Sequence, residues 1–304
     1  MRRTPNQGRP LGSQRSASVA LLGLMASTLG CSVQTDDYST SEVLGSAQAI
    51  LLVQRVDSAE GVSRGDALAG FVRLPPSADR DAALAMAGLV QEIPPAGTCR
   101  LRTFSSDTRP VSELSRIDLL DAAAVELQTA STTHQLAPHA IPTVTDLIRG
   151  VVHTSRDRDT AGLPAGERYR WIARDIEELG SLDASFTSPT LPSEVTVGGA
   201  PWEVPGPRKA GPFLDFTWAP AGASDDDTIW IVVENGTRSI GCTFADADGA
   251  GSVPSTWGDE VLAVSGDELR LTLHRIRKHS AVAPGLSNVT VRFDFSLAQT
   301  LVLE

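Results

Sequence analysis

The chain has 304 residues and a formal net charge of −11, with only two lysines beside twenty-four arginines. So acidic a chain has no electrostatic basis for binding nucleic acid, and anionic lipid head groups would repel it. Its length is sufficient for two ordinary domains.

The first thirty residues have the order of a bacterial secretion signal. Arg2, Arg3, Arg9 and Arg15 precede an apolar run over residues 17–29, and no acidic residue occurs in this leader. As a helix, thirteen residues span about 20 Å, which is too short for a bilayer core of roughly 30 Å. Residues 1–30 are therefore predicted to be a signal peptide and not a membrane-spanning anchor.

Thr28-Leu29-Gly30-Cys31 resembles the lipobox of bacterial lipoproteins. Gly30 and Cys31 match that pattern, whereas Thr28 stands where the family usually has Leu, Val or Ile. The resemblance implies cleavage before Cys31 and lipidation of that cysteine, which leaves 274 residues with a net charge of −15. The alternative is an ordinary signal peptide cleaved near Gly30, which would leave a soluble secreted protein.

Residues 31–46 contain the predicted lipidated cysteine and a polar, Ser/Thr-rich stretch that indicates a flexible tether. Residues 47–197 are predicted to form a mostly β domain with strands near 50–53, 68–74 and 99–104. One or two short helices are expected there, because residues 114–127 and 171–179 carry helical stripes. Both stretches also fit short strands, and periodicity does not decide between the two.

Residues 198–212 contain four prolines and four glycines, and are predicted to be a linker between two domains. Residues 213–304 then show six or seven segments in which apolar and polar residues alternate. The pair Asn235-Gly236 suits a type I′ hairpin turn. The prediction is a β-sandwich of immunoglobulin-like size, so the fold class is mostly β with two β-rich domains.

The leader, the tether and the motifs FTWAPAG, DDDTIWIVVENG and IGCTFADADGAGSVPSTW resemble uncharacterised surface or periplasmic lipoproteins of high-GC Gram-negative bacteria. The resemblance is best over the last ninety residues and implies no activity. Its single functional residue is the lipidated Cys31. In enteric bacteria a Ser after that cysteine directs a lipoprotein to the outer membrane, so Ser32 implies that destination over the inner membrane.

Cys99 and Cys242 are the cysteines that remain in the body of the chain. The domain boundaries assign them to different domains, which favours two buried free thiols. An oxidising compartment also permits a disulfide between them, and the sequence leaves this alternative open.

Metal-binding patterns are incomplete. Asp246-Ala247-Asp248-Gly249-Ala250-Gly251 matches the opening of a calcium loop, but Ala250 and Trp257 replace later ligands, so a solvated turn is expected. The five histidines lack the spacing of zinc hydrolases and are expected on the surface (His134, His139, His153, His274 and His279). No metal or other cofactor is predicted.

No nucleophile elbow or phosphate-binding loop occurs, and no catalytic residue is assigned. An envelope hydrolase with a carboxylate pair in the N-terminal domain stays open as an alternative. A carbohydrate-binding module is another, since Trp202 and Trp257 are free to be exposed while Trp218 and Trp230 are expected in the core.

The sequence thus predicts an exported envelope lipoprotein with a non-catalytic binding or scaffolding role. Its contact with the membrane is expected through lipid on Cys31 alone. An envelope protein or a glycan is its expected partner.

Overall fold

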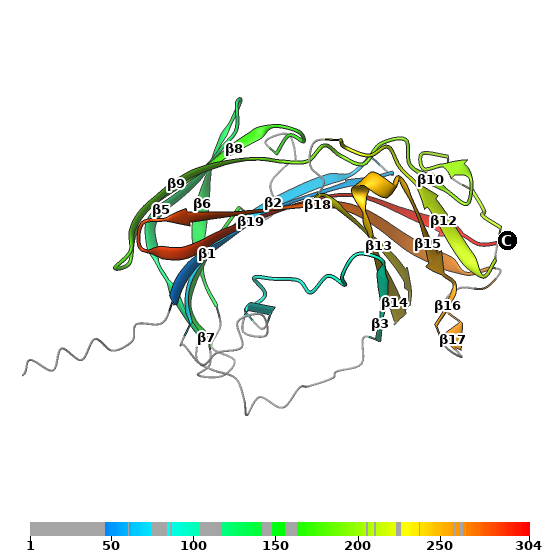
Figure 1. Ribbon diagram of the computed structural model, residues 1–304, viewed down its shortest axis with the longest axis horizontal. Coiled ribbons are helices and arrows are strands. Elements are labelled where there is room, and N and C mark those ends of the chain that lie inside the picture. Colours follow the sequence, from blue (N-terminus) through cyan, green and yellow to red (C-terminus); the bar gives the residue numbers. More distant parts are fainter. Residues whose placement is uncertain are drawn as a thin grey trace, which may run out of the picture. The chain divides into compact units, whose positions relative to one another are not determined.

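Alternating apolar and polar residues form β-strands through most of the described chain (Figure 1). The computed structural model describes residues 46–59, 61–74, 84–85, 87–103, 117–141, 148–155, 163–204, 206–209, 211–222, 226–236, 238–257, 260–261, 264 and 266–304. The predicted signal peptide, Cys31 and nearly all of the predicted tether lie outside these residues. Among the described residues, no helix has the length and apolarity that crossing a membrane requires.

The larger sheet of the described part has the strand order β3-β14-β13-β18-β19-β1-β2-β4-β7-β6-β5-β8-β9. Its strands are β1 Ser46–Ser58, β2 Ser63–Leu74, β3 Thr98–Thr103, β4 Ile117–Leu120, β5 Ala122–Gln128, β6 Thr133–Ala140, β7 Ile148–Thr154, β8 Arg168–Ile176, β9 Gly180–Thr187, β13 Thr228–Asn235, β14 Arg238–Ala245, β18 Glu268–Ala283 and β19 Leu286–Val302. A smaller sheet has the order β11-β10-β12-β15, with β10 Thr196–Val197, β11 Ala200–Pro201, β12 Phe213–Thr217 and β15 Ala250–Pro254. The pair β16 Thr256–Trp257 and β17 Glu260–Val261 and the 3-10 helix η3 Asp246–Asp248 complete these elements.

The first core lies where the larger sheet packs against itself. β6 pairs with β7 through residues 137–140 and with β5 through residues 133–136, so it joins two parts of the sheet. Apolar side chains of β5, β8 and β9 pack in one cluster with those of β1, β2 and the first half of β19. Trp171 and Tyr169 of β8 are fully buried in this cluster, and they form much of its volume.

The second core lies between the larger and the smaller sheet. Ile229, Ile231 and Val233 of β13 point into it, as do Leu269, Leu271 and Leu273 of β18. Val197, Phe216 and Val253 contribute from the smaller sheet. The period-two pattern of residues 213–304 therefore predicts these strands correctly, and the fold class is mostly β.

The strands β18 and β19 serve both cores. They pair antiparallel from Glu268↔Val302 to Ala283↔Leu286, with one irregularity near their hairpin. Alternate residues of β19 from Val289 to Phe295 pack in the first core, and Leu301 and Leu303 pack in the second. Strands of 16 and 17 residues exceed the usual length of about six, which allows one hairpin to reach two cores.

Pairing does not follow the predicted boundary between residues 47–197 and 213–304. β1 pairs parallel with β19 along eleven residue pairs, and β3 pairs with β14. The described strands accordingly belong to one compact unit, residues 42–304. The difference arises because β19, which belongs to the predicted C-terminal domain, pairs with β1 of the predicted N-terminal domain. The two predicted domains therefore share one sheet.

The Pro/Gly-rich residues 198–212 contribute to the second core instead of separating two sheets. Gly198 and Gly199, both with positive φ, make the tight turn between β10 and β11. Trp202 is buried, and its amide donates a hydrogen bond to the Val195 carbonyl at 2.8 Å. The buried Arg208 guanidinium donates to backbone carbonyls of this same segment, at Pro201, Val204, Gly206 and Pro207.

Both stretches that fit either helix or strand form strands. Residues 114–127 contain β4 and β5, which are separated by Asp121, and residues 171–179 belong largely to β8. The expected helices are therefore wrong at these positions. β5 and β8 pair with each other, so a partner strand decides a choice that local periodicity leaves open.

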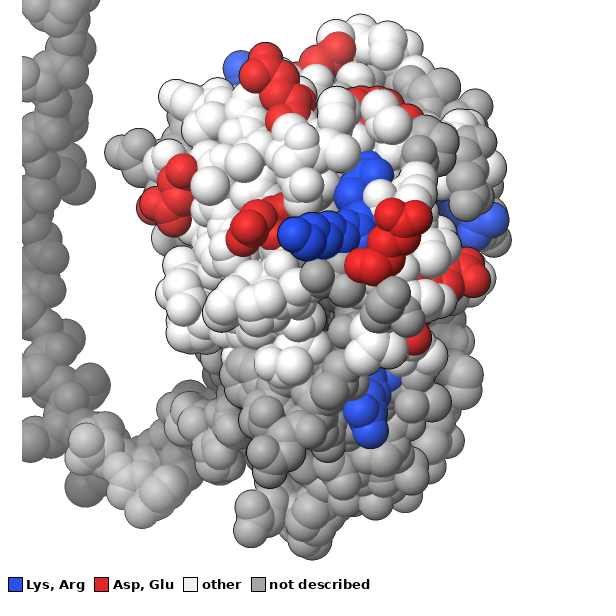
Figure 2. Space-filling model, turned by 90° about the vertical axis from the view of Figure 1, so that its right-hand side faces the viewer, with Lys and Arg blue, Asp and Glu red and all other residues white. Residues whose placement is uncertain are grey.

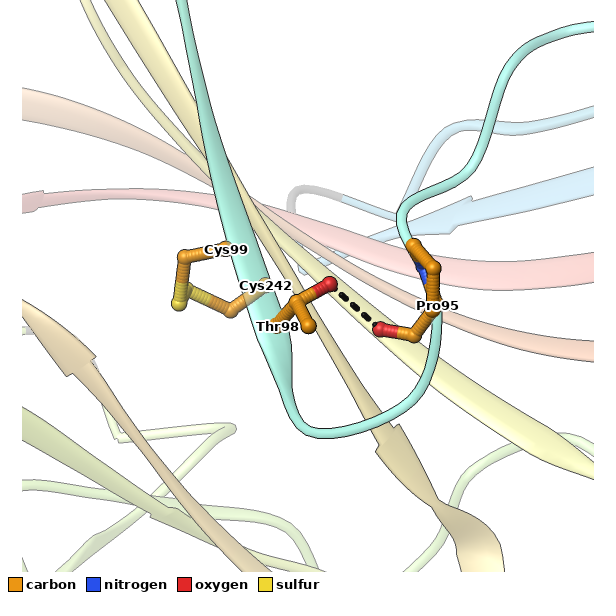
Figure 3. The surroundings of a disulfide bond; sticks show 4 residues. All are labelled: Pro95, Thr98, Cys99 and Cys242. Atoms are coloured by element: carbon orange, nitrogen blue, oxygen red, sulfur yellow. Dashed lines mark hydrogen bonds between the residues drawn. A yellow bond between two sulfur atoms is a disulfide. The ribbon is translucent and has the colours of Figure 1, made fainter.

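Cys99 and Cys242 form a disulfide between directly opposed residues of β3 and β14 (Figure 3). Their Cα atoms are 4.0 Å apart, and Cys242 is fully buried in the second core. Beside them the Thr98 hydroxyl donates to the Pro95 carbonyl at 2.6 Å, which closes the turn into β3. The favoured expectation of two free thiols is wrong because β3, although early in the chain, pairs with β14 at the second core. The strands around the first core are called the first sandwich below, and those around the second core the second sandwich.

Two buried ion pairs hold the segment that leads from β9 to β10 against β18. Arg277 donates two hydrogen bonds to Asp227, at 2.7 and 2.6 Å, and a third to the Ser188 carbonyl at 3.1 Å. Arg275 donates to Asp246 at 3.0 Å and to the Leu191 carbonyl at 2.9 Å. All four charged side chains are at least nine-tenths buried. These contacts fix the segment where the chain passes from the first core to the second.

Candidate binding groove

A groove of about 320 Å³ lies on the face of β13 and β18 that points away from the second core. Residues that alternate with the core positions line it, as the period of a strand requires. Gln91 and Pro94, from the segment that precedes β3, border it. Its polar and aromatic lining comes from Arg100, Arg102, Trp230, Glu234, Arg270 and His274.

The segment before β3 is fixed by apolar contacts of its own. Leu84 and Leu89 are buried with Ile50 and Val72 in a third cluster on this sheet face. A Cβ on Gly70 of β2 would lie 2.9 Å from a methyl carbon of Leu89, so glycine makes room for that side chain. Figure 1 shows this cyan segment leading to β3. The border of the groove is therefore a packed element of the fold.

Trp230 forms one wall of the groove and is 4 % exposed. Its indole lies over Gly241, where an added Cβ would be 2.6 Å from Nε1. The His274 ring stacks on the indole at a centroid distance of 4.7 Å. The indole N–H has no hydrogen-bond acceptor among the described residues. This nitrogen is enclosed by the fold, so Trp230 contributes to the groove wall through the rest of its side chain.

Three arginines line the groove. Arg100 and Arg102 lie two residues apart on β3, on the face opposite Cys99 and Leu101. Arg100 forms a 2.5 Å ion pair with Glu92, whose hydrogen bond and charge raise the pKa of Arg100 above its ordinary value. Arg102 donates to the Glu92 carbonyl at 2.7 Å. The Arg270 side chain is 68 % exposed, and its Nε atom lies 3.8 Å from Oε2 of Glu234.

Behind the groove wall, a buried chain of charges holds the His274 ring. His274 Nδ1 donates to Asp294 Oδ1 at 2.7 Å, and Arg292 donates to the other carboxylate oxygen at 2.5 Å. Burial acts to raise the pKa of Asp294, but the charges and hydrogen bonds of His274 and Arg292 outweigh it and lower the pKa to about 2. The carboxylate thereby orients the imidazole against Trp230.

The interacting charges of His274, Asp294 and Arg292 predict that the protein loses stability in acid. Asp294 has a lower pKa folded than unfolded, so its contribution is complete above about pH 4 and is lost as the pH falls toward 2. The expected contribution is about 2 kcal/mol. Urea unfolding of wild type and Asp294→Asn between pH 2 and 5 measures it. The variant should be less stable near pH 5 and should approach the wild type near pH 2; a constant difference would contradict the assignment.

The candidate calcium loop is an internal part of the fold. Asp246 is 2 % exposed, and its second carboxylate oxygen accepts the Ala221 amide at 2.6 Å while the first binds Arg275. The expected solvated turn is therefore wrong at this residue. Gly249, with φ of 64°, ends η3. No group of three metal-ligating side chains occurs among the described residues.

Two of the five histidines are not on the surface as expected. His153 is 2 % exposed, and burial lowers its pKa although Asp121 acts in the other direction. His274 is largely covered by Trp230 and Asp294. Trp218 and Trp230 are buried as predicted, and Trp202 is buried as well. The side chain of Trp257 lies outside the described residues.

The hydrolase alternative requires a carboxyl group with a raised pKa. Asp183 and Asp294 are the described carboxyl groups with a displaced pKa, and in both it is lowered. For Asp183 the cause is its hydrogen bond with Arg170. The described residues thus provide no observation that favours this alternative.

Figure 2 shows the face that carries the end of the second sandwich near β10, β12 and β15. Acidic and basic side chains are interspersed there on a mostly uncharged surface. The described residues of this face therefore present no extended patch of one charge, in contrast to the grouped arginines of the groove.

No protein-family model matches the chain, and a search of curated proteins found no match. A two-domain fibronectin type III segment of chicken tenascin aligns with 69% of this chain and 94% of its own, at 14% identity and a TM-score of 0.22. The mu homology domain of Fcho1 from Danio rerio, with bound Eps15 peptide, aligns with 84% of this chain and 96% of its own, at 10% identity and a TM-score of 0.27. The FN1–FN3 domains of chicken CNTN1 align with 67% of this chain and 64% of their own, at 14% identity and a TM-score of 0.19. These likenesses assign no family, and the fold class rests on the strand pairing of the chain itself.

Proposed function

We propose that this protein is an exported cell-envelope lipoprotein that binds a partner in the groove and is held to the membrane by lipid on Cys31. The groove carries the binding role: three guanidinium groups line one hollow together with the Trp230 and His274 side chains. Sites that hold ligands are typically concave, with a few converging polar groups on a rigid frame. No chemical step is assigned to these residues.

The disulfide supports the exported location. Such bonds persist in oxidising compartments such as the periplasm and are rare in the cytosol. The Cys99–Cys242 bond joins an edge strand to the second sandwich, so its formation and the folding of that sandwich are linked. The lipobox-like residues Thr28 to Cys31 support the anchor, and Ser32 favours the outer membrane.

A labelling experiment tests the anchor. Cells that express the wild type or Cys31→Ala are fed a fatty-acid probe, and inner and outer membranes are separated. The wild type should be labelled and found mainly in the outer membrane, whereas Cys31→Ala should carry no label. Label that persists in the variant, or label in neither protein, would refute the anchor.

The same cells test the binding role if a photo-crosslinking residue replaces Thr272 in the groove. A matched protein carries it at Ser181, which is exposed on β9 of the first sandwich. An adduct of defined mass is expected from position 272 and not from position 181. Equal adducts from both positions, or none from position 272, would contradict a partner in the groove.

A further inference from the structure

We propose that the groove binds a small oxyanion that carries carboxylate or phosphate groups, an inference that rests on the proposed binding role and names its ligand class. The polar lining is rich in donors. Arg100, Arg102 and Arg270 carry guanidinium groups, which donate hydrogen bonds and accept none. Glu234 is the carboxylate among the described residues of this lining. A ligand that satisfies these groups must present several acceptor oxygens.

The charge of the groove differs from that of the whole chain. A protein of net charge −11 groups three arginines around one hollow with a single lining carboxylate. Glu92 contacts both Arg100 and Arg102, the first through its carboxylate and the second through its backbone carbonyl. These two guanidiniums are thereby positioned, and a positioned guanidinium binds a carboxylate or phosphate through two parallel hydrogen bonds.

The size of the site indicates a small ligand. The groove measures about 320 Å³, and a second hollow of about 440 Å³ adjoins it through Val56 and Arg270. Small-molecule sites fall in the range of roughly 300–1,000 Å³. Arg64 lines the second hollow, so the positive groups continue from one hollow to the next. β14 and β13 separate Arg102 on β3 from Arg270 on β18, so a ligand that contacts both must carry more than one anionic group.

Calorimetric titration of the full chain, extracted in detergent, tests this inference with citrate as a carboxylate probe and inorganic phosphate as a phosphate probe. At low ionic strength, at least one probe should bind, and added salt should weaken the binding. Arg270→Gln and Arg102→Gln should each lower the affinity about tenfold. Glu234→Gln should raise it, because the variant removes the negative charge and replaces one acceptor oxygen by an NH₂ donor.

Arg170→Gln is the matched control. It removes the same charge from an exposed arginine on β8, in the first sandwich, and should leave the affinity unchanged. Arg270 is exposed and its replacement should not affect folding, which thermal unfolding of each variant checks.

Binding of citrate or of phosphate identifies which oxyanion the groove prefers, and either result supports the inference. Absence of binding by both probes at millimolar concentration would overturn it, as would equal losses in Arg270→Gln and Arg170→Gln. Those failures leave the labelling and crosslinking results standing, so they are distinguishable from failure of the proposed function.

Discussion

Replacing Asp227 with alanine should lower the free energy of unfolding by roughly 3–5 kcal/mol. Asp227 and Arg277 are both buried and share two parallel hydrogen bonds. Without the carboxylate, Arg277, a residue of 5 % exposure, keeps its charge with no counterion. An unpaired buried charge carries a large free-energy penalty. Urea unfolding monitored by tryptophan fluorescence measures the loss.

The exposed pair Arg170–Asp183 provides the control for this prediction. It has the same two-bond geometry, at 2.8 and 2.5 Å, but both side chains are about half exposed. Asp183→Ala should therefore cost less than about 1 kcal/mol. The double variant Asp227→Leu with Arg277→Met should recover most of the stability, because it removes both charges. Equal losses in Asp227→Ala and Asp183→Ala would contradict a structural role for the buried pair.

Removing the disulfide should cost roughly 3–5 kcal/mol. The bond closes a sequence separation of 143 residues, and an unfolded chain without it gains the corresponding freedom. The double variant Cys99→Ala with Cys242→Ala tests this by urea unfolding. Alanine is suited to the test because Cys242 is fully buried among apolar side chains.

Hydrogen exchange gives a second readout for the same variant. Among the described strands β3 is at the edge of its sheet and pairs with β14 alone, so its amides should lose protection when the bond is absent. The amides of β1 and β19, which lie between paired neighbours, should change little. A loss below 1 kcal/mol together with unchanged β3 exchange would show that the disulfide does not hold this edge.

The strands of the second sandwich follow from local alternation. Ile229, Ile231 and Val233 point into the core as predicted, because one face of the strand is buried and the other is not. The predicted turn is placed one residue too early. Asn235 pairs with Arg238, so Gly236, with φ of 59°, is the first residue of the turn. Strand existence is thus readable from the sequence, while the turn position depends on register.

Long-range pairing is what the sequence does not show. Nothing local in residues 98–103 indicates that they pair with residues 238–243. This pairing creates the disulfide and also places Arg100 and Arg102 at the groove. A weak signal is present, since Arg100 and Arg102 alternate with Cys99 and Leu101 in the manner of a half-buried strand. Trp230 is correctly predicted as buried, but its place on the groove face follows from the position of the second core.

The central claim is an exported, oxidised and lipid-anchored protein, and the intact mass of the chain extracted from cell envelopes tests it most directly. The predicted mass is that of residues 31–304 with a lipid group on Cys31, lighter by two hydrogen atoms than the same chain after reduction. A chain that begins elsewhere, an unmodified Cys31, or a mass unaffected by reduction would contradict the account.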